Sequence, residues 1–399
     1  ERLDLEVSVG TPSARVLLTG QIGVGKSTEL WELSRLYTSK QSLLAIHCDL
    51  EREMSPERCG AIGVLLAMFR DAWAFHQVLF QQPPPDGVTD RILSALVDWL
   101  KAERTADGRQ IIFQFGGMDF EMSLAQGKSR IVAIILGKAA QHQALLKRVP
   151  SEGLIPDKLV TLFNEYIRYL KNRTGKRILL IVDHVDKIRD EVAARETLIE
   201  TVSHWGRLDA NLVITAPYEF TLGEMRAPVE GYWGRPVVLY PEPVPELHCG
   251  PIRKDGVPIF YHKMREATGL DEHLNEGELR ALAHYSGGIP RCFTLLISAA
   301  VKNAIFSGEE RIGRAHVEMA ISEAQADYQD YPDEYLRLLD EIVQTQQGLG
   351  RAMQLLRSPI SLVVEPVAGG GQHFRAHPLA ERSLRLYRER HRAPMAGER

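Results

Sequence analysis

The first 240 residues alternate between short apolar runs and longer amphipathic stretches. The run at 177–183, Arg-Ile-Leu-Leu-Ile-Val-Asp, has only apolar residues between its charged ends. A run of this length without polar interruption predicts a strand that is buried on both faces, as in a parallel sheet covered by helices. Similar runs predict strands at 15–20, 42–48, 211–215 and 236–240, and a strand or hairpin at 111–118.

Helical periodicity fills the intervals between these runs. Apolar residues recur at helical spacing over 28–37, 59–80, 92–100 and 159–170. Strands that alternate with helices predict a doubly wound α/β core with a parallel sheet, at residues 1–240. The interval 83–156, which opens with three prolines, is longer than a minimal connection, and we expect it to be a helical insertion that carries a partner surface.

The pattern changes after the proline-rich hinge at 241–245. Helical periodicity at 257–267, 276–285, 291–305 and 316–329 predicts an all-helical domain at 241–330. The remainder, 331–399, contains a helical pattern from residue 334, an apolar run at 361–365, a glycine turn at 369–371 and an arginine-rich helical stretch at 379–391. This order predicts a small winged-helix-like unit.

Composition and charge narrow the class of protein. With 44% hydrophobic and 25% charged residues among 399, the chain is globular, neither disordered nor fibrous. A net charge of -4 creates no global field toward nucleic acid or membrane, so any such binding needs a local patch. The 4 cysteines form no CxxC pair, and no apolar run reaches the ~18 residues of a membrane span. We expect a cytoplasmic protein without membrane contact.

The beginning of the chain carries a separate expectation. The sequence has no initiator methionine and enters a strand pattern almost at once. Both features indicate a fragment, or a chain trimmed to its ordered part.

A glycine-rich loop is the strongest chemical signal. Residues 20–27, Gly-Gln-Ile-Gly-Val-Gly-Lys-Ser, match the P-loop pattern G-x-x-x-x-G-K-[ST] between a predicted strand and a predicted helix. In such a loop the glycines turn backbone N–H groups toward a β-phosphate, the lysine reaches the β- and γ-phosphates, and the hydroxyl completes a Mg²⁺ shell. The alternative is a chance match in a glycine-rich turn. The predicted nucleotide-binding residues are Gly20, Gln21, Ile22, Gly23, Val24, Gly25, Lys26, Ser27 and Thr28.

Two further residues extend this site. Asp183 ends the run 177–183, where its carboxylate would hold Mg²⁺ together with Ser27, although such an aspartate could also cap the next helix. In Ser-Gly-Gly-Ile-Pro-Arg, 286–291, the glycines end one helix and Arg291 lies in the first turn of the next. A cation is unfavourable at a helix N-terminus, which predicts a compensating anion; the alternative is a simple interhelical turn.

Together these motifs resemble the AAA+ superfamily, especially its Orc/Cdc6-like and STAND-like branches. The resemblance implies a P-loop ATPase core, an all-helical lid and a winged helix, with ATP and Mg²⁺ as cofactors. It implies that Thr215 is the sensor 1 residue and Arg291 the sensor 2 residue, although Thr215 could also be a strand residue without ligand contact. AAA+ proteins usually place Glu after the strand-ending Asp, whereas this chain has His184 there.

The departure at His184 leaves the catalytic assignment open. The spacing Asp183-x-x-Asp186 resembles the second acid of STAND proteins such as NACHT proteins, so Asp186 or His184 would position the attacking water, or hydrolysis would be slow. The resemblance also implies an arginine finger supplied in trans, for which Arg226 and Arg235 lie in the expected interval.

Three functions are compatible with these features. The first is an ATP-gated switch of conformation and self-association that acts on an effector, as in bacterial antiviral defence. The second is a DNA-associated regulator of the Orc/Cdc6 or TniB/TnsC type, and the third is an ATP-binding scaffold without turnover. In the second, the arginine-rich helix would bind the phosphate backbone, but it could equally be a solvated face. Its arginines are Arg382, Arg385, Arg388, Arg390 and Arg392.

Overall fold

A computed structural model describes two compact units. The described residues are 14–40, 43–51, 60–82, 87, 91, 112–115, 118–121, 157–242, 244, 273–347, 361–367 and 371–391. The first unit comprises Glu1–Thr19, Lys26–Tyr218 and Arg226–Val237, and the second comprises Gly20–Gly25, Glu219–Met225 and Val238–Arg399.

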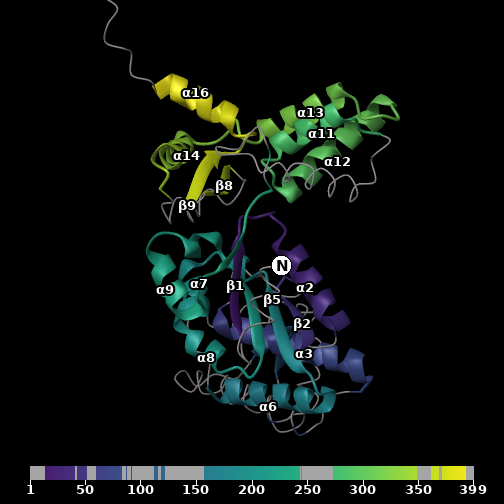
Figure 1. The fold of residues 1–399 in the computed structure, drawn as a ribbon, viewed down its shortest axis with the longest axis vertical. Helices are drawn as coiled ribbons and strands as arrows, with labels where there is room; N and C mark the ends of the chain where they lie inside the picture. Colours follow the sequence, from purple (N-terminus) through teal and green to yellow (C-terminus); the bar gives the residue numbers. More distant parts are fainter. Residues whose placement is uncertain are drawn as a thin grey trace, which may run out of the picture. The chain divides into compact units, whose positions relative to one another are not determined.

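A five-stranded sheet forms the centre of the α/β core (Figure 1). Its strand order is β2-β5-β6-β1-β7, and the pairs β2–β5, β5–β6 and β1–β6 are parallel. The predicted strands and the predicted α/β class with a parallel sheet are therefore confirmed. The strands are β1 (Arg15–Gly20), β2 (Leu43–Asp49), β5 (Arg177–Asp183), β6 (Asn211–Ala216) and β7 (Val237–Leu239).

The register of the sheet sets the position of its polar strand ends. In β5 every residue after Arg177 is buried, as its continuous apolar run predicts. The parallel pairing of β2 with β5 places Asp49 opposite Asp183 at the carboxyl edge of the sheet. Ligands bind at this edge in open parallel α/β sheets, because loops that follow the strands meet there.

Helices lie on either side of this sheet (Figure 1). Helices α2 (Lys26–Lys40) and α3 (Ala61–Phe80) pack on β2, and α6 (Asp157–Thr174) packs on β5. The buried positions of α6 include Leu159, Phe163 and Leu170, which is the apolar face that its periodicity predicts.

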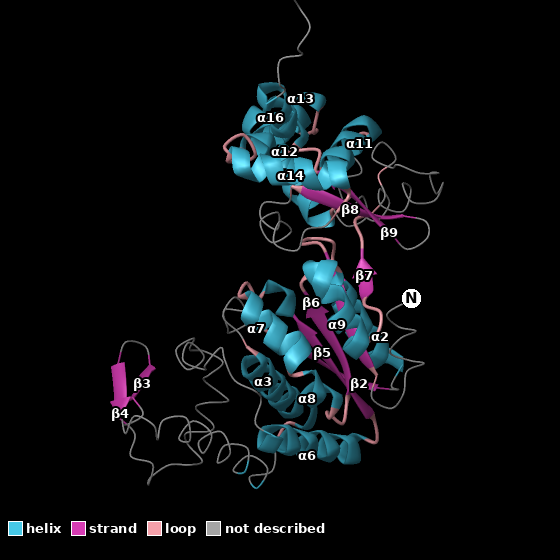
Figure 2. Cartoon of the chain, turned by 90° about the vertical axis from the view of Figure 1, so that its left-hand side faces the viewer, coloured by secondary structure: helices cyan, strands magenta, loops and turns pink. Residues whose placement is uncertain are grey.

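The chain between β5 and β7 contains short elements that the sequence pattern did not predict. They are η3 (Val185–Lys187), α7 (Glu191–Arg195), the π-helical η4 (Glu196–Glu200), α8 (Val202–Gly206), η5 (Tyr218–Thr221) and α9 (Gly223–Trp233). Within the predicted insertion, β3 (Ile112–Phe115) and β4 (Met118–Glu121) form an antiparallel hairpin (Figure 2). The helix expected at 92–100 lies outside the described residues.

The second unit is mostly helical. Three helices pack against one another: α11 (Glu276–Tyr285), α12 (Pro290–Ser307) and α13 (Arg314–Ala326). They confirm three of the helices predicted for residues 241–330, whereas the fourth, at 257–267, lies outside the described residues. None of the described helices of the chain is long and apolar enough to cross a membrane.

The last described elements are a helix, a two-stranded hairpin and a second helix, in this order along the chain. Helix α14 (Asp333–Thr345) packs on α16 (Glu381–His391) and on β9 (Gly371–Ala376), which pairs antiparallel with β8 (Leu362–Val367). The predicted helix, strand and arginine-rich helix are thus present. The winged-helix arrangement and the domain boundaries at 240 and 330 stay predictions.

Candidate functional site

Lys26 and Ser27 begin α2 and face the loop that follows β5. The ammonium Nζ of Lys26 lies 2.9 Å from Oδ2 of Asp186 in η3. Both side chains are nearly buried, with exposed fractions of 7% and 10%. A buried ion pair compensates the desolvation of its two charges only while both partners are in place. Asp186 therefore holds the lysine of the glycine-rich motif inside the first unit.

Asp183 ends β5 beside this pair, and only 1% of its surface is exposed. Its Oδ1 accepts a hydrogen bond of 2.7 Å from the backbone N–H of His184. Its Oδ2, like Oδ1 of Asp186, is buried and has no hydrogen-bond partner among the described residues. Because a buried carboxylate oxygen without a partner is costly, the two atoms indicate a site for a cation, a water molecule or a hydrogen-bond donor.

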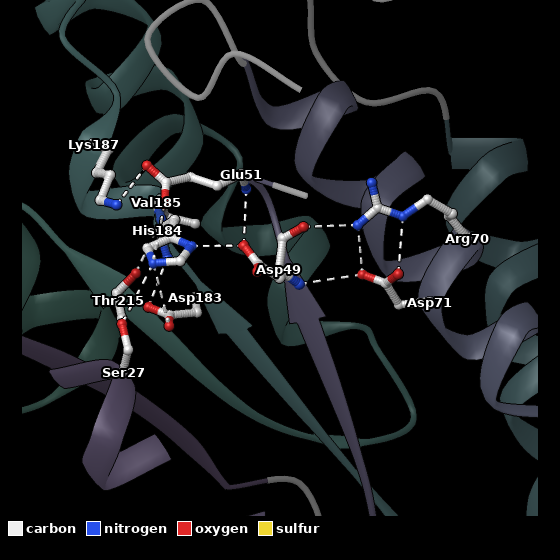
Figure 3. Close-up of polar contacts among 10 residues, drawn as sticks. All are labelled: Ser27, Asp49, Glu51, Arg70, Asp71, Asp183, His184, Val185, Lys187 and Thr215. Atoms are coloured by element: carbon white, nitrogen blue, oxygen red, sulfur yellow. Dashed lines mark hydrogen bonds and ion pairs between the residues drawn. The ribbon is translucent and has the colours of Figure 1, made fainter. Parts of the chain in front are cut away.

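His184 connects Ser27 to the end of β2 (Figure 3). Its backbone has a φ of 68°, an uncommon conformation for a residue other than glycine. Its Nδ1 lies 2.6 Å from Oδ1 of Asp49, and its Nε2 lies 3.4 Å from Oγ of Ser27 and 3.7 Å from Oδ2 of Asp183. The ring thus lies between two carboxylates and the serine of the glycine-rich motif.

Opposing effects act on the pKa of His184. Burial lowers it, but the hydrogen bond to Asp49 and the charge of Asp183 outweigh burial, so that the pKa lies above its usual value. The same hydrogen bond lowers the pKa of Asp49 to about 2, against the opposing effect of its partial burial. Asp49 is therefore ionised at neutral pH and accepts a hydrogen bond from Nδ1.

A buried ion pair binds the backbone of Asp49 (Figure 3). Arg70 and Asp71 in α3 form this pair at 2.7 Å. Arg70 also donates to the backbone carbonyl of Asp49 at 2.7 Å. The backbone N–H of Asp49 donates to Oδ2 of Asp71 at 3.2 Å. Our sequence interpretation missed Asp49 as a site residue. The available signal was that Asp49 ends a buried run as Asp183 does, and ends of neighbouring parallel strands share one edge.

Thr215 reaches the same cluster from β6. Its hydroxyl oxygen accepts a hydrogen bond of 3.0 Å from the backbone N–H of Val185, and its side chain is fully buried. This bond fixes the start of η3, the segment that also carries Asp186. The expected contact of Thr215 with a phosphate or water stays a prediction, while its structural bond to η3 is observed.

The glycine loop lies in the second unit, together with Arg291. The backbone N–H of Arg291, in the first turn of α12, donates to the carbonyl of Gly23 at 3.3 Å. Gly23 has a φ of 85°, and a Cβ there would lie 2.8 Å from the Cβ of Arg291. This approach requires glycine at position 23. The Arg291 side chain is exposed, and its predicted role toward a phosphate is untested.

Gln21 ties the same loop to β8. Its Nε2 donates to the carbonyl of Leu362 at 2.7 Å, and its Oε1 accepts from the N–H of Val364 at 3.0 Å. The other loop residues of the motif, Ile22 and Val24, are partly exposed, and Thr28 in α2 is exposed. The structure therefore groups the predicted residues by unit. Lys26, Ser27, Asp183, His184, Asp186 and Thr215 form a cluster in the first unit, and Gly23 meets Arg291 in the second.

Several of the other predicted arginines have acidic partners. Arg226 pairs with Glu230 one turn along α9 at 2.9 Å, while Arg235 is exposed before β7. On α16, Arg388 binds Asp340 at 2.6 Å and Arg390 binds Asp333 at 2.9 Å, both in α14. Arg392 lies outside the described residues. These pairs favour a packing role for α16 over the predicted contact with DNA.

Comparison with known proteins places these observations beside solved structures. Cdc6p from Pyrobaculum aerophilum is similar at 13% identity and a TM-score of 0.46, over 98% of this chain and 93% of that one. The ORC2 protein of Aeropyrum pernix in its ADP form has 13% identity and a TM-score of 0.45, over 99% and 93%. The RuvB Holliday junction branch migration motor of Thermotoga maritima has 14% identity and a TM-score of 0.31, over 56% and 74%.

These neighbours are of the Orc/Cdc6 kind that the motifs resemble, together with RuvB. No protein-family model matches the sequence, and no curated protein matches it. With identities below 15% and TM-scores below 0.5 for the three proteins named, no residue role is carried over from them.

Proposed function

We propose that this protein binds ATP with Mg²⁺, hydrolyses it slowly, and uses the bound nucleotide as a switch. One observation carries the proposal: at the carboxyl edge of a parallel sheet, beside the buried Asp183, the lysine that follows a glycine loop pairs with Asp186 and the next residue, Ser27, contacts His184. Lys26 supplies a cation for phosphate oxygens, and Gly20–Gly25 precede it in the chain as the P-loop pattern requires.

The residues present fit a magnesium ion. Ser27 Oγ and the unpartnered Oδ2 of Asp183 are hard oxygen donors of the kind that Mg²⁺ prefers. Among the described residues, no group of three or more His, Cys, Asp or Glu could hold a metal ion by itself. A magnesium ion here would complete its shell with water and with phosphate oxygens, whose negative charge it would neutralise.

The Lys26–Asp186 pair supports nucleotide gating. A phosphate that binds Lys26 competes with Asp186 for the same ammonium, so binding would release a buried carboxylate in η3. Because Thr215 holds the other end of η3 through Val185, the change would reach β6. A ligand shifts a conformational equilibrium only through contacts that differ between two states, and this exchange is such a contact.

ATP binding measured by calorimetry with Mg²⁺ tests the proposal. Lys26→Ala removes the ammonium, and we expect it to weaken ATP binding at least about tenfold, since a charge-assisted contact contributes on the order of 1.5–3 kcal/mol. Lys187→Ala is the matched control, because Lys187 lies in the same η3 region but pairs with Glu51. Equal ATP affinity in wild type and Lys26→Ala would contradict the proposal.

The proposal includes self-association and a protein effector. We infer self-association in the ATP state and action on a protein effector, with antiviral defence as the biological setting that the STAND-like motif spacing suggests. The DNA-associated alternative has less support, because Arg388 and Arg390 on α16 are engaged by acids of α14. The scaffold alternative differs by its lack of turnover, which release of inorganic phosphate would measure.

A further inference from the structure

Asp49 is held in a fixed position at the end of β2. Its backbone is bound on both sides, by Arg70 at the carbonyl and by Asp71 at the N–H. Its carboxylate Oδ1 accepts from the backbone N–H of Glu51 at 2.9 Å as well as bonding to His184. The position of this carboxylate relative to the sheet is therefore set by α3 and by the chain after β2.

This fixed carboxylate orients the imidazole of His184. Because Asp49 is an acceptor, the bond of 2.6 Å keeps a hydrogen on Nδ1, so that of the two tautomers of the neutral ring it selects the one with hydrogen on Nδ1. In that tautomer Nε2 carries the lone pair, and it faces Oγ of Ser27 at 3.4 Å and Oδ2 of Asp183 at 3.7 Å. These are the two residues that the proposed function assigns to the magnesium ion.

Two other carboxylates of the cluster are each paired with a lysine. Asp186 is bound to Lys26 at 2.9 Å. Glu51 lies 3.6 Å from Nε2 of His184 but is paired with Lys187 at 2.5 Å. Nε2 of His184 is thus an acceptor in this cluster whose direction a second side chain, that of Asp49, determines.

We propose that Asp49 is a positioning residue for nucleotide hydrolysis, which through its bond to Nδ1 directs Nε2 of His184 to accept a hydrogen bond from the attacking water. The inference rests on the proposed function. In the reaction the water oxygen bonds to the γ-phosphorus, the bond from that phosphorus to the β,γ-bridging oxygen breaks, and ADP leaves with the electron pair. One water proton stays on inorganic phosphate and the other passes to solvent.

A double-mutant cycle in the full chain tests this role through steady-state ATP hydrolysis. Asp49→Leu removes the acceptor. We expect kcat to fall about tenfold to a hundredfold, as for other residues that orient a functional side chain through a hydrogen bond. KM should change by less than about twofold, since ground-state contacts are unaffected. Asp49→Asn restores an acceptor for Nδ1 and should recover kcat to within about threefold of wild type.

The decisive variant is the double substitution with His184→Ala. If Asp49 acts through His184, Asp49→Leu in the His184→Ala background should lower kcat by no more than about twofold further. A full additional loss would overturn the inference, because Asp49 would then act independently of His184. Asp190→Leu is the matched control: its carboxylate caps α7 in the same unit, so kcat should stay at the wild-type level.

A second readout does not depend on turnover. In the ¹⁵N spectrum of histidine-labelled protein at about pH 9, where an imidazole is neutral, the signals lost in His184→Ala should report hydrogen on Nδ1. Asp49→Leu should shift these signals toward the form with hydrogen on Nε2. An unchanged tautomer in folded Asp49→Leu protein would overturn the inference, whatever the effect of the substitution on kcat.

The outcomes separate the inference from the proposed function. Wild-type protein that binds no ATP would contradict both. Protein that binds ATP but releases no phosphate above the Lys26→Ala background would leave nucleotide binding intact and overturn the role of Asp49.

Discussion

At the scale of single residues, the site depends on side chains whose partners are buried with them. Lys26 and Asp186 neutralise one another, whereas Oδ2 of Asp183 and Oδ1 of Asp186 have no hydrogen-bond partner among the described residues. An unpartnered buried oxygen lowers stability, and its retention is typical of positions where a ligand supplies the missing contact.

His377 gives a prediction about pH at the same scale. It is fully buried, bonds the carbonyl of Ser286 through Nε2 at 3.1 Å, and accepts from the N–H of Leu379 through Nδ1 at 3.3 Å. Burial lowers its pKa from 6.5 to about 4, although the bond to Ser286 acts in the opposite direction. Above pH 6.5 neither the folded nor the unfolded chain is protonated there, so His377 does not change stability with pH.

Below pH 6.5 the unfolded chain binds a proton that the folded chain excludes. Stability should fall by about 1.4 kcal/mol per pH unit until the folded pKa is reached, a loss of about 3 kcal/mol. Urea unfolding at several pH values measures this slope. His377→Gln should flatten it between pH 6.5 and about 4. The same slope in His377→Gln would show that other groups cause the acid sensitivity.

At the scale of elements, two glutamines cover the two open edges of the C-terminal hairpin. Gln21 binds Leu362 and Val364 on β8, and Gln346, at the end of α14, binds the N–H and carbonyl of Phe374 on β9 at 2.8 and 2.9 Å. Open strand edges are prone to pair with other chains, so these amides satisfy groups that would otherwise be a hazard. One of these two glutamines, Gln21, belongs to the glycine loop.

Hydrogen exchange measures this contact directly. Gln21→Ala should reduce the protection of the Val364 amide about fivefold, as expected for loss of one hydrogen bond of about 1 kcal/mol. Gln346→Ala is the matched control, and it should expose the Phe374 amide instead while leaving Val364 unchanged. Identical protection of Val364 in wild type and Gln21→Ala would show that the loop does not hold β8 in solution.

At the scale of the whole molecule, the proposed switch predicts a nucleotide-dependent size. Light scattering after gel filtration should show a larger species with ATP than with ADP or without nucleotide, because only ATP carries the γ-phosphate that competes for Lys26. Lys26→Ala should remove the difference, and Lys187→Ala should keep it. Assembly that persists in Lys26→Ala would argue against nucleotide gating and leave ATP binding as a separate property.

The sequence by itself determined the elements and the class of chemistry. Continuous apolar runs identified β5 and its neighbours, helical periodicity identified α6, α11 and α12, and the pattern at 20–27 identified a phosphate-binding loop. These signals are local, because burial of a strand or of one helix face requires a pattern over adjacent turns. Between β5 and β7, the helices of three to five residues escaped prediction because they are too short to show a period, and α9, with 11 residues, has Pro228 in its interior, which argues against a helix.

Only the tertiary structure decided which polar groups meet. Asp49 and His184 are 135 residues apart, and Gln21 and Leu362 are 341 apart, so no local spacing could indicate either contact. The pairing of Lys26 with Asp186 and of Val185 with Thr215 likewise follows from the strand order of the sheet. The physical reason is that strand order and register arise from packing of the whole core, whereas a residue pattern reports only the burial of its own element.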